Sequence, residues 1–355
     1  MDYNIYLKCD NLQYTGSCVE RGIRNAFVAK NEVMSQRGVL VPSNGNTALG
    51  AAYHGGSLGI PVTVILPDRT PPSLTHRCAD LGADVVLFGE TLEDVINYAK
   101  KANRDENQTL LSSDDPLILA GLGSLGVEII TQLPETDAVI VPVAAGGLLA
   151  ATLVACKKLK CTCLVYGAEC AKVPKMMKPL QAGHPISVPV VPNLAQGLNA
   201  SIVGQNAFAT IKGRLDRMLT VDESYIARAV INILERERLV ADGAGVCALA
   251  AVMQGLVPEL RGRRAVCVIS GGNIDPARLT QTIQRGLGVS GRLMRFGVAL
   301  PDNCHGDVGT TWANVVVETA NEEHASTFKD RLREQYPSIR FAIADIDDKH
   351  KVTIR

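Results

Sequence analysis

The sequence has no excess of charge of either sign. Its 355 residues include 36 lysines and arginines and 36 aspartates and glutamates, which leaves a formal net charge of zero. Nucleic acids and anionic membrane surfaces are normally bound through a basic excess, so we expect neither as a partner. The composition instead favours a small-molecule ligand.

Long apolar runs are also missing. No uninterrupted hydrophobic stretch approaches the roughly 20 residues that cross a bilayer. The N-terminal segment MDYNIYLKCD lacks the order of basic and then apolar residues that marks a secretory signal. We therefore expect a cytoplasmic protein.

The ten cysteines show no regular spacing. Most lie in apolar segments such as RRAVCVIS at 263–270 and GVCALAAV at 245–252. This distribution predicts buried free thiols in a reducing compartment and no disulfide framework. The densest segment is CTCLVYGAEC at 161–170, but its first two cysteines alternate along an expected strand and no histidine is near. We therefore expect no zinc site.

The chain is rich in short β-forming runs that alternate with helical stretches. Expected strands cover 38–43, 61–67, 83–89, 137–143, 161–169 and 264–270, and expected helices include 47–59, 72–82, 91–103 and 146–159. This alternation predicts an α/β fold in which helices cover both faces of parallel sheet.

Small and polar residues follow three of these strands. They are SNGNT at 43–47, AAGGL at 144–148 and SGGN at 270–273. In parallel sheets, ligands bind beyond the carboxyl ends of the strands. The AAGGL segment runs into an expected helix, where free backbone N–H groups can hold a phosphate. Any one of these loops is also compatible with a plain tight turn, but three together favour a shared pocket.

The segment GLGSLG at 121–126 matches the G-x-G-x-x-G dinucleotide pattern. The apolar run before it is short and follows a proline, and the next expected strand ends in small residues where a ribose-binding acid is required. We therefore interpret these residues as packing glycines at a helix start.

The segment LQYTGSCVERGIRNAF at 12–27 predicts another helix start. Ser17 and Glu20 have the S-x-x-E spacing of a capping box, in which each side chain accepts a hydrogen bond from a backbone N–H group. The prediction places Val19 in the first helical turn.

Residues from about 293 onward predict a small α+β unit of their own. A strand within 291–302 and a strand at 315–320 precede a charged helix at 322–335, and IRFAIAD at 339–345 predicts a final strand.

Six segments of the chain carry a resemblance to a known family. They are LKCDNLQYTGSCVERG, SNGNTALGAA, DDPLILAGLGSLGVEI, VPVAAGGLLA, DGAGVCALAA and VISGGNID. In unbroken order, from about residue 6 to 290, they resemble the motifs of the pyridoxal-phosphate-dependent threonine and serine dehydratases, or ammonia-lyases. This is the fold-type-II branch that includes serine racemase.

The resemblance implies the tryptophan synthase β-like architecture, with two lobes of parallel sheet flanked by helices. It implies a catalytic region at 1–292, with a smaller lobe at roughly 30–130 inserted in the larger one, and a shortened ACT-like regulatory domain at 293–355. Family members carry a helix and a further strand before the LK pair at 7–8, so N-terminal elements are expected to be missing. The family further implies a homodimer or homotetramer, or a hetero-oligomer with an active paralogue.

The resemblance also assigns roles to single residues. Asn46 would lie against the phenolic oxygen of pyridoxal 5'-phosphate, and Ser270 would hydrogen-bond its pyridine nitrogen. Asp242 stands near the ring, where the family usually has glutamate. The substrate carboxylate would be held by Ser43, Asn44, Gly45 and Asn46, and the cofactor phosphate by the backbone amides of Ala144, Ala145, Gly146, Gly147 and Leu148.

The decisive departure from the family is at position 19. The opening motif of the family is S-F-K-x-R-G, whose lysine forms the Schiff base with the cofactor, and here Val19 occupies the lysine position. The lysine both anchors the cofactor aldehyde and moves the α-proton of the substrate, and a valine does neither. Ala144 and Ala145 replace two family glycines, which would cost about 1–2 kcal/mol if either position needs a positive φ. The sequence therefore predicts weakened, non-covalent cofactor binding.

A second departure concerns metal binding. In the racemase-like branch a divalent cation is held by a glutamate and by an aspartate six residues later, and here these positions are Glu169 and Lys175. A lysine ammonium opposite Glu169 would replace the charge of the cation, so we expect no metal. A solvated surface pair is the alternative interpretation.

Three interpretations of the protein are compatible with these observations. The first is a catalytically impaired homologue of L-threonine/L-serine ammonia-lyase that still binds pyridoxal phosphate or an amino acid as a regulatory partner. The second is an active L-threonine/L-serine dehydratase whose lysine is hidden by an incomplete or variant sequence. The third is a fragment that does not fold independently.

Overall fold

The computed structural model describes residues 3–106, 108–200, 202–300, 311–336 and 339–341. Within these residues the strands form two parallel sheets and one antiparallel sheet. The predicted α/β fold with helices on both faces of parallel sheet is therefore confirmed.

The larger parallel sheet has the strand order β1-β9-β6-β7-β8. These strands are Asn4–Cys9, Arg264–Ile269, Ala138–Pro142, Leu164–Cys170 and Arg217–Val221. The smaller parallel sheet has the order β4-β3-β2-β5. Its strands are Asp84–Leu87, Val62–Leu66, Val39–Pro42 and Thr109–Leu110.

The helices of the two lobes lie between and around these strands. They are α1 (Val19–Ala29), α2 (Asn31–Arg37), α3 (Asn46–Leu58), α4 (Pro72–Asp80), α5 (Leu92–Glu106), α6 (Pro116–Leu122), α7 (Ser124–Gln132), α8 (Gly147–Leu159), α9 (Met177–Ala182), α10 (Gln205–Ile211), α11 (Glu223–Asn232), α12 (Cys247–Met253) and α13 (Pro276–Val289). Short 3-10 helices cover Asp10–Leu12, Gln196–Leu198 and Pro258–Leu260, and a π-helical turn at Ile233–Glu237 continues α11.

Alternate residues of the central strands enter two different cores. Ile140 and Cys267 pack with α11 and α12 on one face of the larger sheet. Val139 and Val266 pack with α7, α8 and α10 on the other face. Both sets are apolar because this sheet is covered on both sides, which explains its near-continuous hydrophobic strands.

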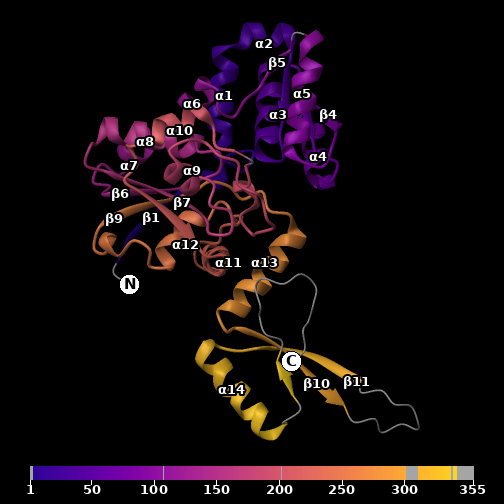
Figure 1. The fold of residues 1–355 in the computed structure, drawn as a ribbon, viewed down its shortest axis with the longest axis vertical. Helices are drawn as coiled ribbons and strands as arrows, with labels where there is room; N and C mark the ends of the chain where they lie inside the picture. The colour runs from indigo at the N-terminus through magenta and orange to yellow at the C-terminus, as the bar shows by residue number, and fades with distance from the viewer. Residues whose placement is uncertain (1–2, 107, 201, 301–310, 337–338, 342–355) are drawn as a thin grey trace.

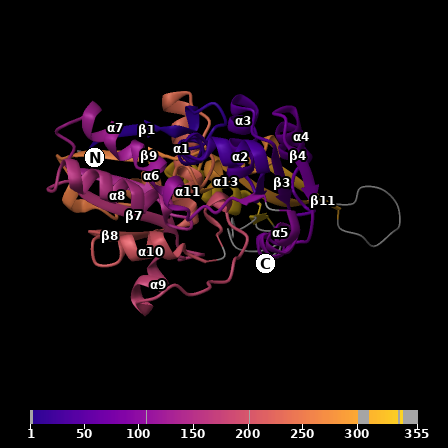
Figure 2. The ribbon, with the colours of Figure 1, turned by 90° about the horizontal axis from the view of Figure 1, so that it is seen from above.

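The smaller sheet forms a second lobe with its own core. Phe27 of α1 packs with Val64 and Leu66 of β3 on one face, and Ile65 packs with Val95 of α5 on the other. In both views, α3, α4 and β4 group on one side of the two lobes and β7 and β9 on the other (Figures 1 and 2). The carboxyl ends of the strands of both sheets lead to the loops described below.

The GLGSLG segment lies on α6 and α7 and follows no strand directly, so it is not a dinucleotide loop. A Cβ atom at Gly121 would lie 2.6 Å from the Cβ of Asn25 on α1, and one at Gly126 would lie 2.8 Å from the Cβ of Ala155 on α8. The prediction of packing glycines is therefore confirmed.

The expected strand at 161–169 begins later than predicted. The β7 strand starts at Leu164, because the N–H of Cys163 donates to the carbonyl of Lys160 and closes a turn there. The C-x-C pair thus precedes the strand, with Cys161 exposed and Cys163 buried.

Where the chain is described, no helix is both long and apolar enough to cross a membrane.

The C-terminal unit is built on an antiparallel sheet. Strand β10 (Leu293–Leu300) pairs with β11 (Thr311–Glu318) and with β12 (Arg340–Phe341), and α14 (Glu322–Gln335) packs on one face through Phe328. Helix α13 leads into this unit, which stands apart from the two lobes (Figure 1). Residues 342–345 of the predicted final strand lie outside the described residues.

Candidate functional site

One cleft brings together the loops that follow the strands. Its volume is about 1430 Å³, and both lobes line it. Its lining contains every residue that the resemblance assigns to cofactor or substrate: Val19, Ser43, Asn44, Gly45, Asn46, Ala144, Ala145, Gly146, Gly147, Leu148, Asp242 and Ser270. Their placement in one cleft is observed, whereas their roles remain predictions.

The start of α1 is held against the loop that carries Ser270. The N–H of Cys18 donates to the carbonyl of Ser270 at 2.9 Å, and the N–H of Gly272 donates to the carbonyl of Gly16 at 3.0 Å. Ser17 and Gly271 form an isolated antiparallel bridge between these contacts. These backbone contacts therefore hold the start of α1 close to Ser270.

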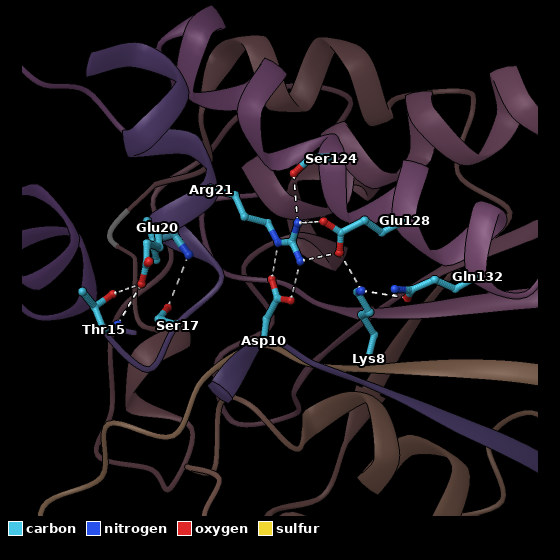
Figure 3. A network of polar contacts seen from close by, with 10 residues as sticks. Lys8, Asp10, Thr15, Ser17, Glu20, Arg21, Ser124, Glu128 and Gln132 are labelled. Carbon is cyan, nitrogen blue, oxygen red and sulfur yellow. Dashed lines mark hydrogen bonds and ion pairs between the residues drawn. The ribbon is translucent and has the colours of Figure 1, made fainter. Parts of the chain in front are cut away.

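The predicted capping box does not form at this helix start. The hydroxyl of Ser17 accepts from the N–H of Val19 at 3.4 Å, and not from Glu20 (Figure 3). The Glu20 carboxylate reaches past Ser17 and accepts from the N–H and the hydroxyl of Thr15, at 2.8 and 2.7 Å. The prediction was wrong because the turn at Gly16 brings Thr15 within reach of Glu20.

An arginine on the first turn of α1 joins three elements (Figure 3). The Arg21 guanidinium donates to both carboxylate oxygens of Asp10, at 2.7 and 2.9 Å, and to both of Glu128 on α7, at 2.7 and 2.8 Å. Hydrogen bonding to Arg21 lowers the pKa of Glu128 to about 2. This network orients the turn that presents position 19 to the cleft.

Val19 itself offers no polar atom to the cleft. Its side chain is half-buried and packs against the core of the smaller lobe. Lys100 on α5 is the one lysine among the described residues that line the cleft, and its side chain is exposed. Lys8 is held elsewhere, because its Nζ lies 2.6 Å from Glu128 Oε2.

The 144–148 loop has the backbone of an anion site. Gly146 has φ +96°, and α8 begins at the next residue. No carbonyl of the described residues accepts a hydrogen bond from the amides of this loop, so these donors are free for a ligand. A Cβ atom at Gly146 would also lie 2.7 Å from Met176 Cε, but the positive φ is the stronger reason for a glycine here.

Ala144 and Ala145 carry no backbone strain. Arg238 is the one non-glycine residue with a positive φ in the described part of the chain. Both alanines therefore have φ values that a Cβ atom tolerates. The backbone strain that the sequence analysis considered for a positive φ is absent at these two positions.

The 43–46 loop is organised by its serine. The buried Ser43 hydroxyl accepts from the N–H of Gly45 at 3.1 Å and from the N–H of Ala48 at 3.2 Å. Asn46 is the first residue of α3. The loop therefore presents the start of a helix, where an anionic ligand is favoured.

Asp242 turns back on its own loop. Its Oδ1 accepts from the N–H of Gly245 at 2.6 Å. Burial raises the pKa of this carboxyl above its usual range. The side chain borders the cleft, but one of its oxygens is hydrogen-bonded within the glycine-rich turn before α12.

Glu169 and Lys175 lie outside the cleft lining, and their side chains bond different backbone groups. The Glu169 carboxylate accepts from the N–H groups of Met176 and Met177, at 2.7 and 2.9 Å, and burial raises its pKa to about 7. Lys175 is 2% exposed, and its Nζ donates to the carbonyl of Val188 at 3.2 Å.

The predicted opposition of ammonium and carboxylate was therefore wrong. Backbone N–H groups at the start of α9 donate to Glu169, and Lys175 donates to a different acceptor, the carbonyl of Val188. The surface-pair alternative is wrong as well, because both side chains are buried. The described residues contain no group of three or more metal-ligating side chains arranged around a metal site.

No role was assigned from the sequence to many of the residues that line the cleft, and Asn273 and Arg77 are two of them. Asn273 follows the SGG segment directly, so its position in that loop was the available signal. Arg77 lies on α4, where nothing in the sequence distinguishes it from a solvent-exposed helix residue.

The cleft is suited to a ligand with a phosphate and a polar ring. Free amides at a helix start suit the phosphate, and the Asn46 amide and the Ser270 hydroxyl suit ring oxygen and nitrogen atoms. Pyridoxal phosphate has both features, so these residues fit it. Val19 does not fit its covalent attachment, because the valine side chain carries no nucleophile.

Comparisons with known proteins agree with this geometry. A family model described as "Pyridoxal-phosphate dependent enzyme" matches residues 1–271. The L-threonine ammonia-lyase of Geobacter sulfurreducens is 36% identical over 299 residues, which cover 84% of this chain and 74% of that protein. The L-threonine ammonia-lyase of Thermotoga maritima is 33% identical over 357 residues, covering 98% and 86%.

Solved structures give the same result. Processed threonine deaminase isoform 2 of Solanum lycopersicum superposes with a TM-score of 0.75 at 27% identity, covering 79% of this chain and 82% of that one. Serine racemase of Dictyostelium discoideum superposes with a TM-score of 0.71 at 29% identity, covering 77% and 88%. This chain therefore belongs to the family of pyridoxal-phosphate dependent enzymes, with the fold-type-II architecture.

Proposed function

We propose that this protein is a catalytically impaired relative of the L-threonine/L-serine ammonia-lyases that binds pyridoxal phosphate without a covalent bond. One observation carries the proposal. Val19 stands at the start of α1, beside Ser270 and in the lining of the cleft, where the family motif has its lysine. The loops that would hold the cofactor line the same cleft, so the proposal attributes the loss of activity to this side chain.

The remaining residues supply binding and orientation. Amides of the 144–148 loop hold the phosphate, Ser270 bonds the ring nitrogen, and Asn46 donates to the ring oxygen. Bound pyridoxal phosphate would supply an electron-withdrawing ring that stabilises negative charge at the α-carbon of an amino acid. The 43–46 loop receives the carboxylate of L-serine or L-threonine. No side chain at position 19 is available to take the α-proton, which is why turnover is impaired.

The rest of the molecule extends the proposal. We place the catalytic region at 1–292 and a shortened ACT-like regulatory domain at 293–355. We further propose a cytoplasmic protein that needs no metal and that assembles as a homodimer, a homotetramer or a hetero-oligomer with an active paralogue. In the hetero-oligomer, amino-acid binding at an inactive site would regulate the active subunit.

The direct test restores the lysine. We expect the purified protein, when incubated with pyridoxal phosphate, reduced with borohydride and dialysed, to retain no covalently attached pyridoxyl group, and to release no keto acid from L-serine or L-threonine. Val19→Lys should retain a covalently attached, borohydride-fixed pyridoxyl group, because the phosphate and ring contacts are in place. Val19→Met, which is also long but has no amine, is the control and should retain none.

An active dehydratase is the alternative, and the cleft lining contains one lysine that could serve it. Lys100 is exposed but lines the cleft. If the unmodified protein fixes pyridoxal phosphate with borohydride and deaminates L-serine, the impaired function is wrong. Mapping the modified peptide would then distinguish Lys100 from another lysine.

A further inference from the structure

Asn273 joins three segments of the cleft through one amide group. Its Nδ2 donates to the carbonyl of Thr15 at 2.7 Å and to Oδ1 of Asn46 at 2.9 Å. Its Oδ1 accepts from Nη1 of Arg77 at 3.1 Å. Thr15 precedes α1, Asn46 begins α3 and Arg77 lies on α4, so this side chain of the larger lobe reaches the smaller one.

The chemistry of its neighbours fixes which way the Asn273 amide points. A guanidinium only donates hydrogen bonds, so the atom of Asn273 that faces Arg77 must be the oxygen. A carbonyl only accepts, so the atom that faces Thr15 must be the nitrogen. A flipped amide would place donor against donor and acceptor against acceptor.

The orientation of Asn273 in turn fixes that of Asn46. Because the Nδ2 of Asn273 donates, the atom of Asn46 that meets it must be Oδ1. The Nδ2 of Asn46 then faces the loop beside Ser270, where it lies 3.5 Å from the position of a Cβ atom built on Gly271. Asn46, Ser270 and Gly271 all line the cleft.

The backbone of the loop before α1 leaves room for the Asn273 side chain. Gly16 has φ +77°, and a Cβ atom there would lie 2.7 Å from Oδ1 of Asn273. A glycine at position 16 therefore lets the asparagine amide lie flat against the loop and reach both Thr15 and Asn46.

We propose that Asn273 is a positioning residue, which orients the Asn46 amide so that its N–H donors face the ring oxygen of pyridoxal phosphate. Arg77 completes this orientation from the opposite lobe. The inference rests on the proposed function, because it concerns a bound pyridoxal phosphate. It assigns to Asn273 no contact of its own with the cofactor.

The test compares two substitutions at position 273 in the full-length protein. Asn273→Ala removes the orienting contacts, and we expect the Kd for pyridoxal phosphate to rise about fivefold, the typical effect of one hydrogen bond. Asn273→Asp keeps the shape and strengthens the contact with Arg77. It presents only acceptors, however, so Asn46 turns its N–H groups toward residue 273 and its oxygen toward the ring. We expect a larger rise, of about tenfold or more.

The second readout is the pH titration of the absorbance of bound pyridoxal phosphate. Both substitutions at position 273 should raise the pKa of its ring hydroxyl, because a donor to the phenolate form is lost. Arg77→Met should raise the Kd by a smaller factor of about two, since Thr15 still restrains Asn273. Asn97 on α5 is exposed and outside the cleft lining, so Asn97→Ala and Asn97→Asp are matched controls with no expected effect.

The outcomes separate this inference from the function it rests on. Binding by the wild-type protein, with Asn273→Asp weaker than Asn273→Ala and with a shifted titration, supports it. If the wild-type protein binds and Asn273→Asp binds as tightly, or the titration does not move, Asn273 is only structural and the inference is overturned. A wild-type protein that binds no pyridoxal phosphate overturns the proposed function itself.

Discussion

At the scale of single residues, Val19 separates the chemistry of the site from its stability. A lysine here would place an ammonium group against the core of the smaller lobe, and desolvation opposes that charge when no aldehyde bonds the amine. Valine fills the same place without this cost. Loss of the catalytic amine is therefore compatible with an unchanged fold.

Gly146 is the residue where we expect the strongest effect on phosphate binding. Gly146→Ala places a Cβ atom at φ +96° and 2.7 Å from Met176 Cε. We expect at least a tenfold rise in the Kd for pyridoxal phosphate and a loss of about 1–3 kcal/mol in the free energy of unfolding. Both are measured by ligand titration and by urea denaturation.

Gly213 provides the matched control for this substitution. Its φ is +73°, but nothing lies within 4 Å of a Cβ atom there. Gly213→Ala should cost stability through its backbone alone and leave the Kd unchanged. Equal effects of the two substitutions on the Kd would show that the 144–148 loop does not bind the phosphate.

At the scale of elements, the Arg21 network determines how α1 is presented to the cleft. It ties the first turn of α1 to the segment after β1 through Asp10 and to α7 through Glu128 (Figure 3). Charged groups with bidentate geometry form the strong class of hydrogen bonds. The helix start is therefore held by side chains of distant segments in addition to its backbone contacts with the Ser270 loop, and not by the predicted capping box.

The network predicts a pH dependence of stability. The pKa of Glu128 is lowered from 4.5 to about 2 by hydrogen bonding to Arg21. Between these pH values the unfolded chain binds more protons than the folded one, so this group adds stability above pH 4.5 and loses it as the pH falls toward 2. Glu128→Gln should flatten that part of the curve of unfolding free energy against pH.

The control for this prediction is a glutamate outside the network. Glu135 is exposed in the turn after α7, and Glu135→Gln should leave the slope unchanged. A slope that persists in Glu128→Gln would mean that other carboxylates account for the acid limb.

At the scale of the whole molecule, the cleft is made by two lobes and the C-terminal unit stands outside it. Both parallel sheets are complete by residue 269, and the antiparallel sheet begins at Leu293. The core of the C-terminal unit, which includes Met294 and Phe296, is separate from those of the lobes. The exposed ion pair of Arg292 with Glu235 spans the junction at 2.8 Å.

We therefore expect residues 1–292 to fold and bind without the C-terminal unit. A chain ending at residue 292 should show a cooperative thermal transition and a Kd for pyridoxal phosphate within about twofold of the full-length value, because no cleft-lining residue is removed. Circular dichroism and ligand titration measure these properties. An unfolded or aggregated product would instead make the C-terminal unit part of the folding core of the lobes.

The sequence by itself determined the elements and the loops of the site. Strand and helix alternate with clear periods, and the small residues at 43–47, 144–148 and 270–273 must follow strands whose carboxyl ends share one edge. The S-x-x-E spacing also placed Val19 in the first turn of a helix, and α1 begins there although the capping box itself does not form.

Only the tertiary structure decided what the side chains at these positions touch. Glu20 bonds Thr15 in place of its predicted cap, and Glu169 and Lys175 bond separate backbone groups. Each contact depends on how the neighbouring turn is closed, which the residue spacing does not show. The contact of Arg77 with Asn273 joins residues 196 positions apart on different lobes. Residue spacing does not show that two such distant residues are in contact. The orientation of Asn46 could therefore be derived only from the tertiary structure.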